Sequence, residues 1–286
     1  MKKVLSCVLV ALMLASLLAV GVSAVVRDDG LNHDYGNIEI VERKSIRLDA
    51  VKDEAYDVAT AIPIATISAT SGDKTSDATA TAYVVYDSQY IWVFVEVDDA
   101  TLATKAASAL ESSYKEDSIE LVFDFANEGK NVAEEAPYQC RLTHEGYISA
   151  RIGQSGTTLQ GTAEQGSKNP VSWLDGFALH RADGTGYDCE FRIAPPTDKF
   201  AIGDRIGLTI LINDYDANGG NRIILNANSM NPIAGTDWNP QHMGSIAFDN
   251  FAPYTADTTI IYVAIAMVAA LAVGAVALIS LKKKAK

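Results

Sequence analysis

One stretch of alternating side chains constrains the fold more than any other part of the chain. Its sequence is Gln89-Tyr-Ile-Trp-Val-Phe-Val-Glu-Val-Asp98. Aliphatic residues occupy every second position, and Trp92, Phe94 and Glu96 occupy the positions between them. That alternation is typical of an antiparallel strand with one buried face. We therefore expect a half-buried strand here, entered through a turn at residues 86–89.

Several other short stretches have the same period of two. They are separated by turn sequences such as Ala182-Asp-Gly-Thr-Gly186. Short strands at this spacing indicate an antiparallel sandwich rather than a parallel sheet covered by helices. The expected fold class is all-β, a jelly-roll-like antiparallel sandwich, with one short helical segment over 100–111. The expected strands cover residues 44–48, 79–86, 119–125, 138–152 (as a hairpin), 177–181, 187–193, 205–213 and 222–226.

The two ends of the chain have the patterns of export and membrane anchoring. A basic start and an apolar run over residues 4–20 precede Val22-Ser-Ala24, which has the form of a cleavage site. Residues 260–281 are uncharged and long enough to cross a bilayer, and a basic tail follows. The expected product is a membrane-anchored, single-pass protein of the cell surface with its N-terminus outside. Its parts are a signal peptide at 1–24, a flexible lead-in at 25–43, the sandwich at 44–250, a linker at 251–259, a transmembrane helix at 260–281 and a cytoplasmic tail at 282–286.

The linker contains a second anchoring signal in altered form. Ala252-Pro-Tyr-Thr-Ala256 resembles the sorting signal Leu-Pro-x-Thr-Gly, with alanine in place of its leucine and its glycine. Wall attachment by a sortase and a plain transmembrane anchor are both consistent with this sequence. Either one keeps the protein at the cell surface.

Charge and cysteine content narrow the classes of function. The formal net charge is −13, and basic residues at both ends leave the middle of the chain more acidic still. Nucleic acid is excluded as a partner, because phosphate binding depends on clustered Lys and Arg.

Cys140 and Cys189 lie in strand-like stretches of an exported domain, so a disulfide between them and two half-buried thiols are equally open.

Several motifs follow one another in a fixed order along the chain. The opening motif is Asp49-Ala-Val-Lys-Asp-Glu-Ala-Tyr-Asp-Val-Ala59, and the central motif is Asp117-Ser-Ile-Glu-Leu-Val-Phe-Asp124. In their order and spacing these motifs resemble the family 9 carbohydrate-binding modules, which are DOMON-like β-sandwiches, and the resemblance spans residues 46–248. Ala50 departs from the family pattern, which usually has glycine there. Later matching stretches lie at 186–195, 212–216, 238–240 and 244–246.

The resemblance implies non-catalytic binding of an oligosaccharide or polysaccharide at a bacterial surface, in support of carbohydrate catabolism by separate glycoside hydrolases. It also implies a slot in which two aromatic rings hold one terminal sugar. Trp238 is the first candidate, Trp173 the second and Trp92 the third, because the first two lie in loop-like stretches. The alternative for each is packing in the core, where Trp is usually largely buried.

Three charged residues are candidates for hydroxyl recognition. Glu96 and Glu120 point away from the aliphatic faces of their strands, and Arg141 alternates likewise. If these strands are neighbours, the three side chains form a polar cluster on one sheet face. The alternative is a solvated ion-pair face of little energetic value.

Calcium is the one cofactor expected, in a structural role that family members often have. Asp214, Asp216 and Asn218 match the start of a calcium loop, with oxygen ligands at alternate positions. The closing glutamate of an EF-hand is absent, and a polar hairpin turn is the alternative. Asp49 and Asp53, with Glu54, form a second candidate set.

Other functions remain open on the sequence alone. Related sandwiches carry haem for electron transfer on axial His or Met, and a purely adhesive or scaffolding module is a third alternative. Catalysis is disfavoured because Asp117 and Glu120, three apart on a strand, point to opposite faces. The side chains available to haem are His144, His180, His242, Met230 and Met243.

Overall fold

A computed structural model describes residues 34–42, 44–68, 71, 74–103, 115–127, 137–153, 159–162, 171–195, 205–216, 221–227 and 243–247. All of them belong to the first of two compact units, Met1–Asp249; the second is Asn250–Lys286. The expected signal peptide, linker, transmembrane helix and tail lie outside the described residues, as does most of the expected helical segment. Within the described part of the chain, no helix is long and apolar enough to cross a membrane.

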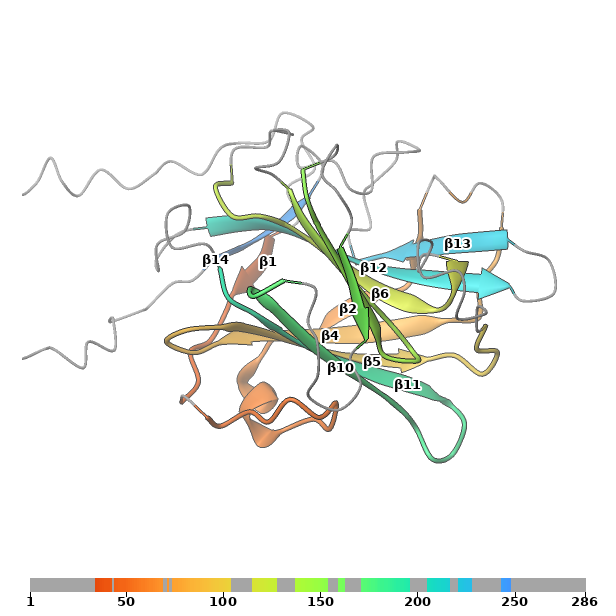
Figure 1. Ribbon diagram of the computed structural model, residues 1–286, viewed down its shortest axis with the longest axis horizontal. Coiled ribbons are helices and arrows are strands. Elements are labelled where there is room, and N and C mark those ends of the chain that lie inside the picture. The colour runs from red at the N-terminus through yellow and green to blue at the C-terminus, as the bar shows by residue number, and fades with distance from the viewer. Residues whose placement is uncertain are drawn as a thin grey trace, which may run out of the picture. The chain divides into compact units, whose positions relative to one another are not determined.

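The strands of the described residues form two sheets (Figure 1). The larger has nine strands in the order β1-β14-β12-β6-β7-β8-β9, with β13 beside β12 and β3 beside β13. Its strands are β1 (Asp34–Asn37), β3 (Thr66–Ile67), β6 (Ser118–Asp124), β7 (Tyr138–Thr143), β8 (Tyr147–Ile152), β9 (Leu159–Thr162), β12 (Arg205–Asp216), β13 (Asn221–Asn226) and β14 (Gly244–Ala247). The smaller has five, in the order β10-β11-β5-β4-β2. They are β2 (Ile62–Ile64), β4 (Thr79–Tyr86), β5 (Ile91–Asp98), β10 (Leu174–His180) and β11 (Gly186–Ile193).

The two sheets pack face to face around a shared core. A Cβ added at Gly176 of β10 would meet Ile148 Cδ1 at 3.0 Å and Leu142 Cδ2 at 3.1 Å, both from the larger sheet. The inward faces carry aliphatic and aromatic side chains that are almost fully buried, among them Val93, Val95, Ile119 and Leu121. The expected all-β sandwich is confirmed.

One pairing departs from the antiparallel expectation. β1 pairs with β14 in parallel, and it lies within the stretch expected to be a flexible lead-in at 25–43. Ile38, next to β1, is buried. The strand expected at 44–48 is absent, because those residues cover the smaller sheet instead.

β5 is more buried than its alternation predicts. Its outward residues Trp92 and Phe94 are 5% and 1% exposed. Residues 38–59, which include the 3-10 helix η1 (Glu54–Val58), cover this face. Tyr56 of η1 packs on Phe94 with ring centroids 5.4 Å apart. The expectation of a half-buried strand was therefore wrong, because a second hydrophobic layer covers the face assigned to solvent.

The side chain of Glu190 on β11 connects this covering segment, residues 38–59, to the smaller sheet through hydrogen bonds. Its Oε2 accepts hydrogen bonds from the backbone N–H groups of Asp49 and Ala50 at 2.9 and 3.0 Å. Its Oε1 accepts one from the hydroxyl of Tyr56 at 2.9 Å. Burial, partly opposed by these donors, raises the pKa of Glu190 to about 7.

Ala50 adopts a left-handed backbone with φ 56°. Such a φ costs an L-residue with a Cβ about 1 kcal/mol relative to glycine. Ala50→Gly should therefore raise the melting temperature by a few degrees, measured by circular dichroism on the full chain. An unchanged or lower melting temperature would contradict this explanation of the glycine usual at this position.

Of the two alternatives left open for the cysteines, the structure has free thiols and no disulfide. Cys140 and Cys189 are both free and buried, Cys140 on β7 of the larger sheet and Cys189 on β11 of the smaller. Facing sheets lie about 10 Å apart, whereas a disulfide needs Cα atoms within about 7 Å. Burial raises the pKa of both thiols, so they remain protonated core side chains.

Candidate functional site

Glu120 is the centre of a hydrogen-bonded polar cluster on the outward face of the larger sheet. The sheet register places it directly opposite Arg141 of β7 and Leu211 of β12. Arg141 Nε donates to Glu120 Oε2 at 3.0 Å, and Arg141 Nη2 donates to the same oxygen. Gln139 donates to Glu120 Oε1. The expected pairing of Glu120 with Arg141 thus has direct contacts in the structure.

Two further side chains complete this polar cluster from β12 and β13. Asn213 Nδ2 lies 3.4 Å from Glu120 Oε2, and Asn213 Oδ1 accepts from Arg222 Nε at 2.7 Å. Arg222 Nη2 lies 3.8 Å from Glu120 Oε2. Sequence reasoning named neither residue in this role, although Asn213 belongs to a recognised motif; only the register of β12 and β13 aligns them. We call Glu120, Gln139, Arg141, Asn213 and Arg222 the polar face.

The charges of the polar face keep its central carboxylate ionised. Glu120 is 1% exposed, and burial alone would raise its pKa. The guanidinium groups of Arg141 and Arg222 outweigh that effect and hold the pKa at about 2. Glu120 is therefore a permanent hydrogen-bond acceptor near neutral pH.

This arrangement is suited to recognition rather than catalysis. An ionised acceptor, two planar guanidinium donors and two amides match hydroxyl groups, each of which donates and accepts. A carboxyl with so low a pKa is a poor general acid for glycoside cleavage. Asp117, the other acid considered for catalysis, lies in a different cluster on the inward side.

Glu96 is not part of the polar face, which corrects that expectation. It lies on β5 of the smaller sheet, paired in register with Asp188 of β11 and Thr81 of β4. The two outward faces of a sandwich are on opposite sides of the molecule. Alternation showed correctly that Glu96 points outward, but it cannot show from which sheet.

Two of the three tryptophans, Trp92 and the half-buried Trp173, make packing contacts in the structure. Trp92 is buried under residues 38–59, and its indole N–H donates to Asp87 at 3.0 Å. Trp173 packs edge-on against Tyr138, with centroids 5.4 Å apart. Tyr138 and Arg141 are on opposite sides of β7, so Trp173 contacts the inter-sheet layer rather than the polar face. Trp238 lies outside the described residues.

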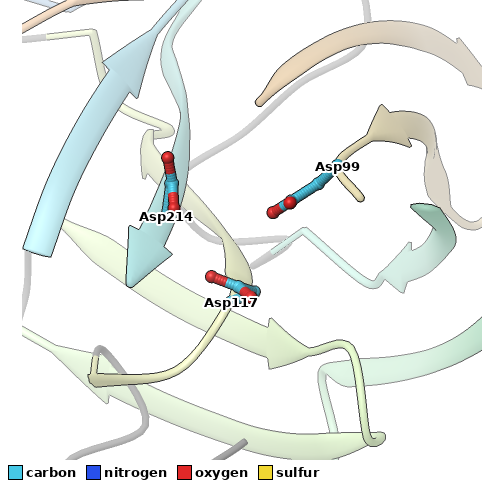
Figure 2. Close-up of side chains that lie close together, drawn as sticks. All are labelled: Asp99, Asp117 and Asp214. Atoms are coloured by element: carbon cyan, nitrogen blue, oxygen red, sulfur yellow. The ribbon is translucent and has the colours of Figure 1, made fainter. Parts of the chain in front are cut away.

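Three carboxylates form a second cluster, between the sheets (Figure 2). Asp99 follows β5 of the smaller sheet, while Asp117 precedes β6 and Asp214 lies on β12 of the larger sheet. One oxygen from each lies within 4.8 Å of the others, and all three residues are buried. Burial and the two neighbouring carboxylates raise the pKa of Asp117 to about 8, against hydrogen bonds from Tyr215 and Ala103.

Of the first set of expected calcium ligands, the structure describes the side chain of Asp214 alone. Asp214 is in the acidic cluster, but the side chain of Asp216 and all of Asn218 lie outside the described residues. The side chains of Asp49 and Asp53 instead accept hydrogen bonds within residues 38–59. Asp53 accepts from the backbone N–H of Arg47 at 2.7 Å, and Asp49 accepts from that of Val51 at 3.1 Å. Among the described residues, Asp99, Asp117 and Asp214 are the one group able to hold a metal ion through three acidic or His/Cys side chains.

Among the described residues, the two histidines considered for haem are not arranged as an axial pair. His144 Nδ1 and His180 Nε2 share a hydrogen bond of 2.8 Å, and their rings are stacked. A metal between them would need about 4 Å, given metal–nitrogen bonds of about 2 Å. Met243 is buried in the core, and His242 and Met230 lie outside the described residues.

A comparison with models of protein families identifies the family of this chain. The model of the family described as "Carbohydrate family 9 binding domain-like" matches residues 48–250, well over half of the chain. The chain belongs to this family. Family 9 modules are non-catalytic carbohydrate-binding modules, which agrees with the expectation that the protein is not an enzyme.

Solved structures of family 9 modules have the same fold. One from Caldicellulosiruptor kristjanssonii, in complex with cellotriose, is 17% identical with a TM-score of 0.54; the match covers 74% of this chain and 92% of that one. A second, from the same organism in complex with glucose, is 18% identical with a TM-score of 0.53, covering 73% and 93%. At this identity the likeness shows the fold. No curated protein matches the chain.

Proposed function

We propose that this family 9 protein binds saccharide through the polar face around Glu120, without cleaving it. The observation that carries the proposal is the buried, ionised Glu120 held between Arg141 and Arg222 on an outward sheet face. Glu120 is almost fully buried, so it would hold the partly exposed guanidinium groups of Arg141 and Arg222 in place as donors to sugar hydroxyls. Such preorganisation lowers the entropic cost of binding. The modules from C. kristjanssonii described in complex with cellotriose and glucose support a β-linked glucan or a related sugar as ligand. Trp238, which lies outside the described residues, stays the first candidate for an aromatic side chain that would contact the sugar.

The proposal includes a place for the protein. A signal peptide at 1–24 and a transmembrane helix at 260–281 would hold the sandwich outside a bacterial cell, where it would present polysaccharide to separate glycoside hydrolases. The support is the charge and hydropathy pattern of the two ends. Protease treatment of intact cells should remove the sandwich while leaving cytoplasmic proteins intact, and protection of the sandwich would contradict this location.

Arg141→Lys is expected to weaken binding of cello-oligosaccharides at least tenfold, measured by isothermal calorimetry on the full chain. Lysine keeps the positive charge beside Glu120 but lacks the planar set of donors, and a good charge-assisted hydrogen bond contributes about 1.5–3 kcal/mol. Arg192→Lys is the matched control. Arg192 forms an ion pair with Asp175 on the smaller sheet, so its replacement should leave affinity unchanged.

Equal affinities of Arg141→Lys and wild type for cello-oligosaccharides would show that the polar face is not the saccharide-binding site. No heat with cello- or xylo-oligosaccharides, from a folded sample with calcium present, would reject saccharide binding. It would favour instead an adhesive or scaffolding role.

A further inference from the structure

Arg151 of β8 is a further arginine beside the polar face, and it has no role in the function proposed so far. The sheet register pairs it with Gln139 and makes it the diagonal neighbour of Arg141, which pairs with Ser149. Diagonal neighbours lie about 7–8 Å apart, within reach of long side chains. Arg151 Nη2 donates to Gln139 Oε1, and Gln139 Nε2 in turn donates to Glu120. Arg151 therefore projects from the same outward sheet face as the polar face.

The positive charge of Arg151 has no carboxylate of its own in the part of the chain that the structure describes. Its hydrogen bond goes to a neutral amide, and none of the ion pairs among these residues includes it. Glu120 is already paired with Arg141, and Arg222 Nη2 lies 3.8 Å from it. Asp124, the other acid that alternation places on this side of β6, forms no ion pair with Arg151. Three guanidinium groups thus lie around one buried carboxylate.

The surroundings of Arg151 disfavour a charge without a counterion. Arg151 is half-buried, and burial lowers its pKa. The carboxylate of Glu120 opposes this lowering in part, and the guanidinium of Arg141 adds to it. An arginine nevertheless stays protonated at neutral pH, so a bound anion would offset a real charge. Such a local excess of positive charge runs against the composition of a chain whose formal net charge is −13.

We propose that the saccharide bound at the polar face is acidic and that Arg151 holds its anionic group, an assignment that rests on the proposed function. A guanidinium offers a planar set of donors that matches a carboxylate or sulfate group. A hexuronic acid carries hydroxyl groups and a carboxylate on a single ring. Its hydroxyl groups would contact Arg141 and Arg222, and its carboxylate would contact Arg151.

The other role open to Arg151 is to orient the amide of Gln139 toward Glu120. A neutral donor would do this without the cost of desolvating a cation. The two roles also predict different effects of removing the charge. A residue that binds the anion affects the affinity for acidic sugars above all, whereas a residue that only orients Gln139 affects acidic and neutral sugars alike.

Glucose and glucuronic acid differ only at C6, so they form a matched pair of ligands. Isothermal calorimetry on the full chain at low ionic strength should give an affinity for glucuronate at least tenfold higher than that for glucose, because a charge-assisted hydrogen bond adds to the contacts of the ring. Glucose 6-sulfate is the third ligand. The tighter of the two acidic sugars identifies the anionic group that the site prefers.

Arg151→Gln tests the residue. The ratio of the glucuronate affinity to the glucose affinity should fall at least tenfold in this variant. Arg192→Gln is the matched control, because it removes the same charge from an arginine that pairs with Asp175 on the smaller sheet. The control should keep the wild-type ratio. An equal loss of affinity for both sugars in Arg151→Gln would show that Arg151 only orients Gln139, and would overturn the proposal.

The dependence on salt is a second readout that needs no variant, so the proposal can be tested even if Arg151→Gln does not fold. Raising the ionic strength from 0.01 to 0.15 M shortens the Debye length from about 30 to about 8 Å. The affinity of wild type for glucuronate should then fall several-fold. Its affinity for glucose should stay the same, because a neutral sugar has no net charge to screen. Equal salt dependence of the two affinities would contradict the proposal.

Failure of this proposal can be told apart from failure of the proposed function. Equal affinities of wild type for glucuronate and glucose, both weakened by Arg141→Lys, would reject an acidic ligand and leave saccharide binding at the polar face in place. No heat with any sugar, neutral or acidic, would reject both. Displacement of glucuronate by acetate at similar concentrations would show an anion site that does not recognise the sugar ring, and would also overturn the assignment.

Discussion

Gly186→Ala is expected to destabilise the sandwich by about 4 kcal/mol, combining backbone strain and steric overlap. Gly186 begins β11 with φ 153°, and an added Cβ would lie 1.9 Å from the carbonyl oxygen of Val97. Backbone atoms of the paired strand cannot move aside as a flexible side chain would. The first pair of the β11–β5 ladder, Gly186 with Asp98, would have to separate.

The effect of this substitution should extend to the acidic cluster. Asp99 donates its backbone N–H to Thr185 at 3.0 Å, and the same N–H would meet the new Cβ at 3.0 Å. We therefore expect Gly186→Ala to lose roughly 10 °C in melting temperature. Thermal unfolding followed by circular dichroism measures this loss.

Gly184→Ala is the control for backbone conformation without overlap. Its φ is 73°, but nothing lies within 4 Å of an added Cβ. The cost should be about 1 kcal/mol, because only the left-handed conformation is penalised. Equal destabilisation of the two variants would show that the close approach to Val97 is unimportant.

Glu190→Gln is expected to remove a large pH dependence of stability. The pKa of Glu190 is raised by burial to about 7 in the folded chain, against about 4.3 when unfolded. Between these values the folded state binds a proton that the unfolded state lacks, so stability falls as pH rises. The contribution is fully present below about pH 4 and is lost through pH 7.

The loss due to Glu190 between pH 4.5 and pH 8 amounts to about 3 kcal/mol. Glutamine does not titrate, and its carbonyl oxygen can still accept from Asp49 and Ala50. Urea unfolding at a series of pH values measures the free energy of unfolding of both proteins. As the pH rises from 4.5 to 8, the free energy of unfolding of Glu190→Gln relative to that of wild type should increase by this amount. Comparing the two cancels the contributions of other titrating groups.

Tyr56→Phe separates titration from hydrogen bonding. It removes the donor to Glu190 Oε1 but keeps the carboxyl, so the fall in stability with pH should persist or steepen. Stability should be lower than wild type throughout. Parallel pH profiles for wild type and Glu190→Gln would mean that Glu190 is not the titrating group.

The sequence by itself determined most of the longer strands and the class of fold. Alternation and turn residues are local properties, and they correctly indicated β4, β5, β6 and the hairpins β7–β8, β10–β11 and β12–β13. The order and spacing of the motifs likewise indicated the family. Local patterns suffice here because a strand's period of two and a turn's residue preferences depend on near neighbours in the chain.

Only the tertiary structure decided which outward side chains share a face. Alternation placed Glu96, Glu120 and Arg141 outward, but strand order put Glu96 on the other sheet and brought Asn213 and Arg222 to Glu120. The tertiary structure also covered Trp92 with residues 38–59 and separated Cys140 from Cys189. Asp99, Asp117 and Asp214 come together from two sheets. Long-range strand pairing sets the distances between them, and these distances cannot be read from the spacing of the residues in the sequence.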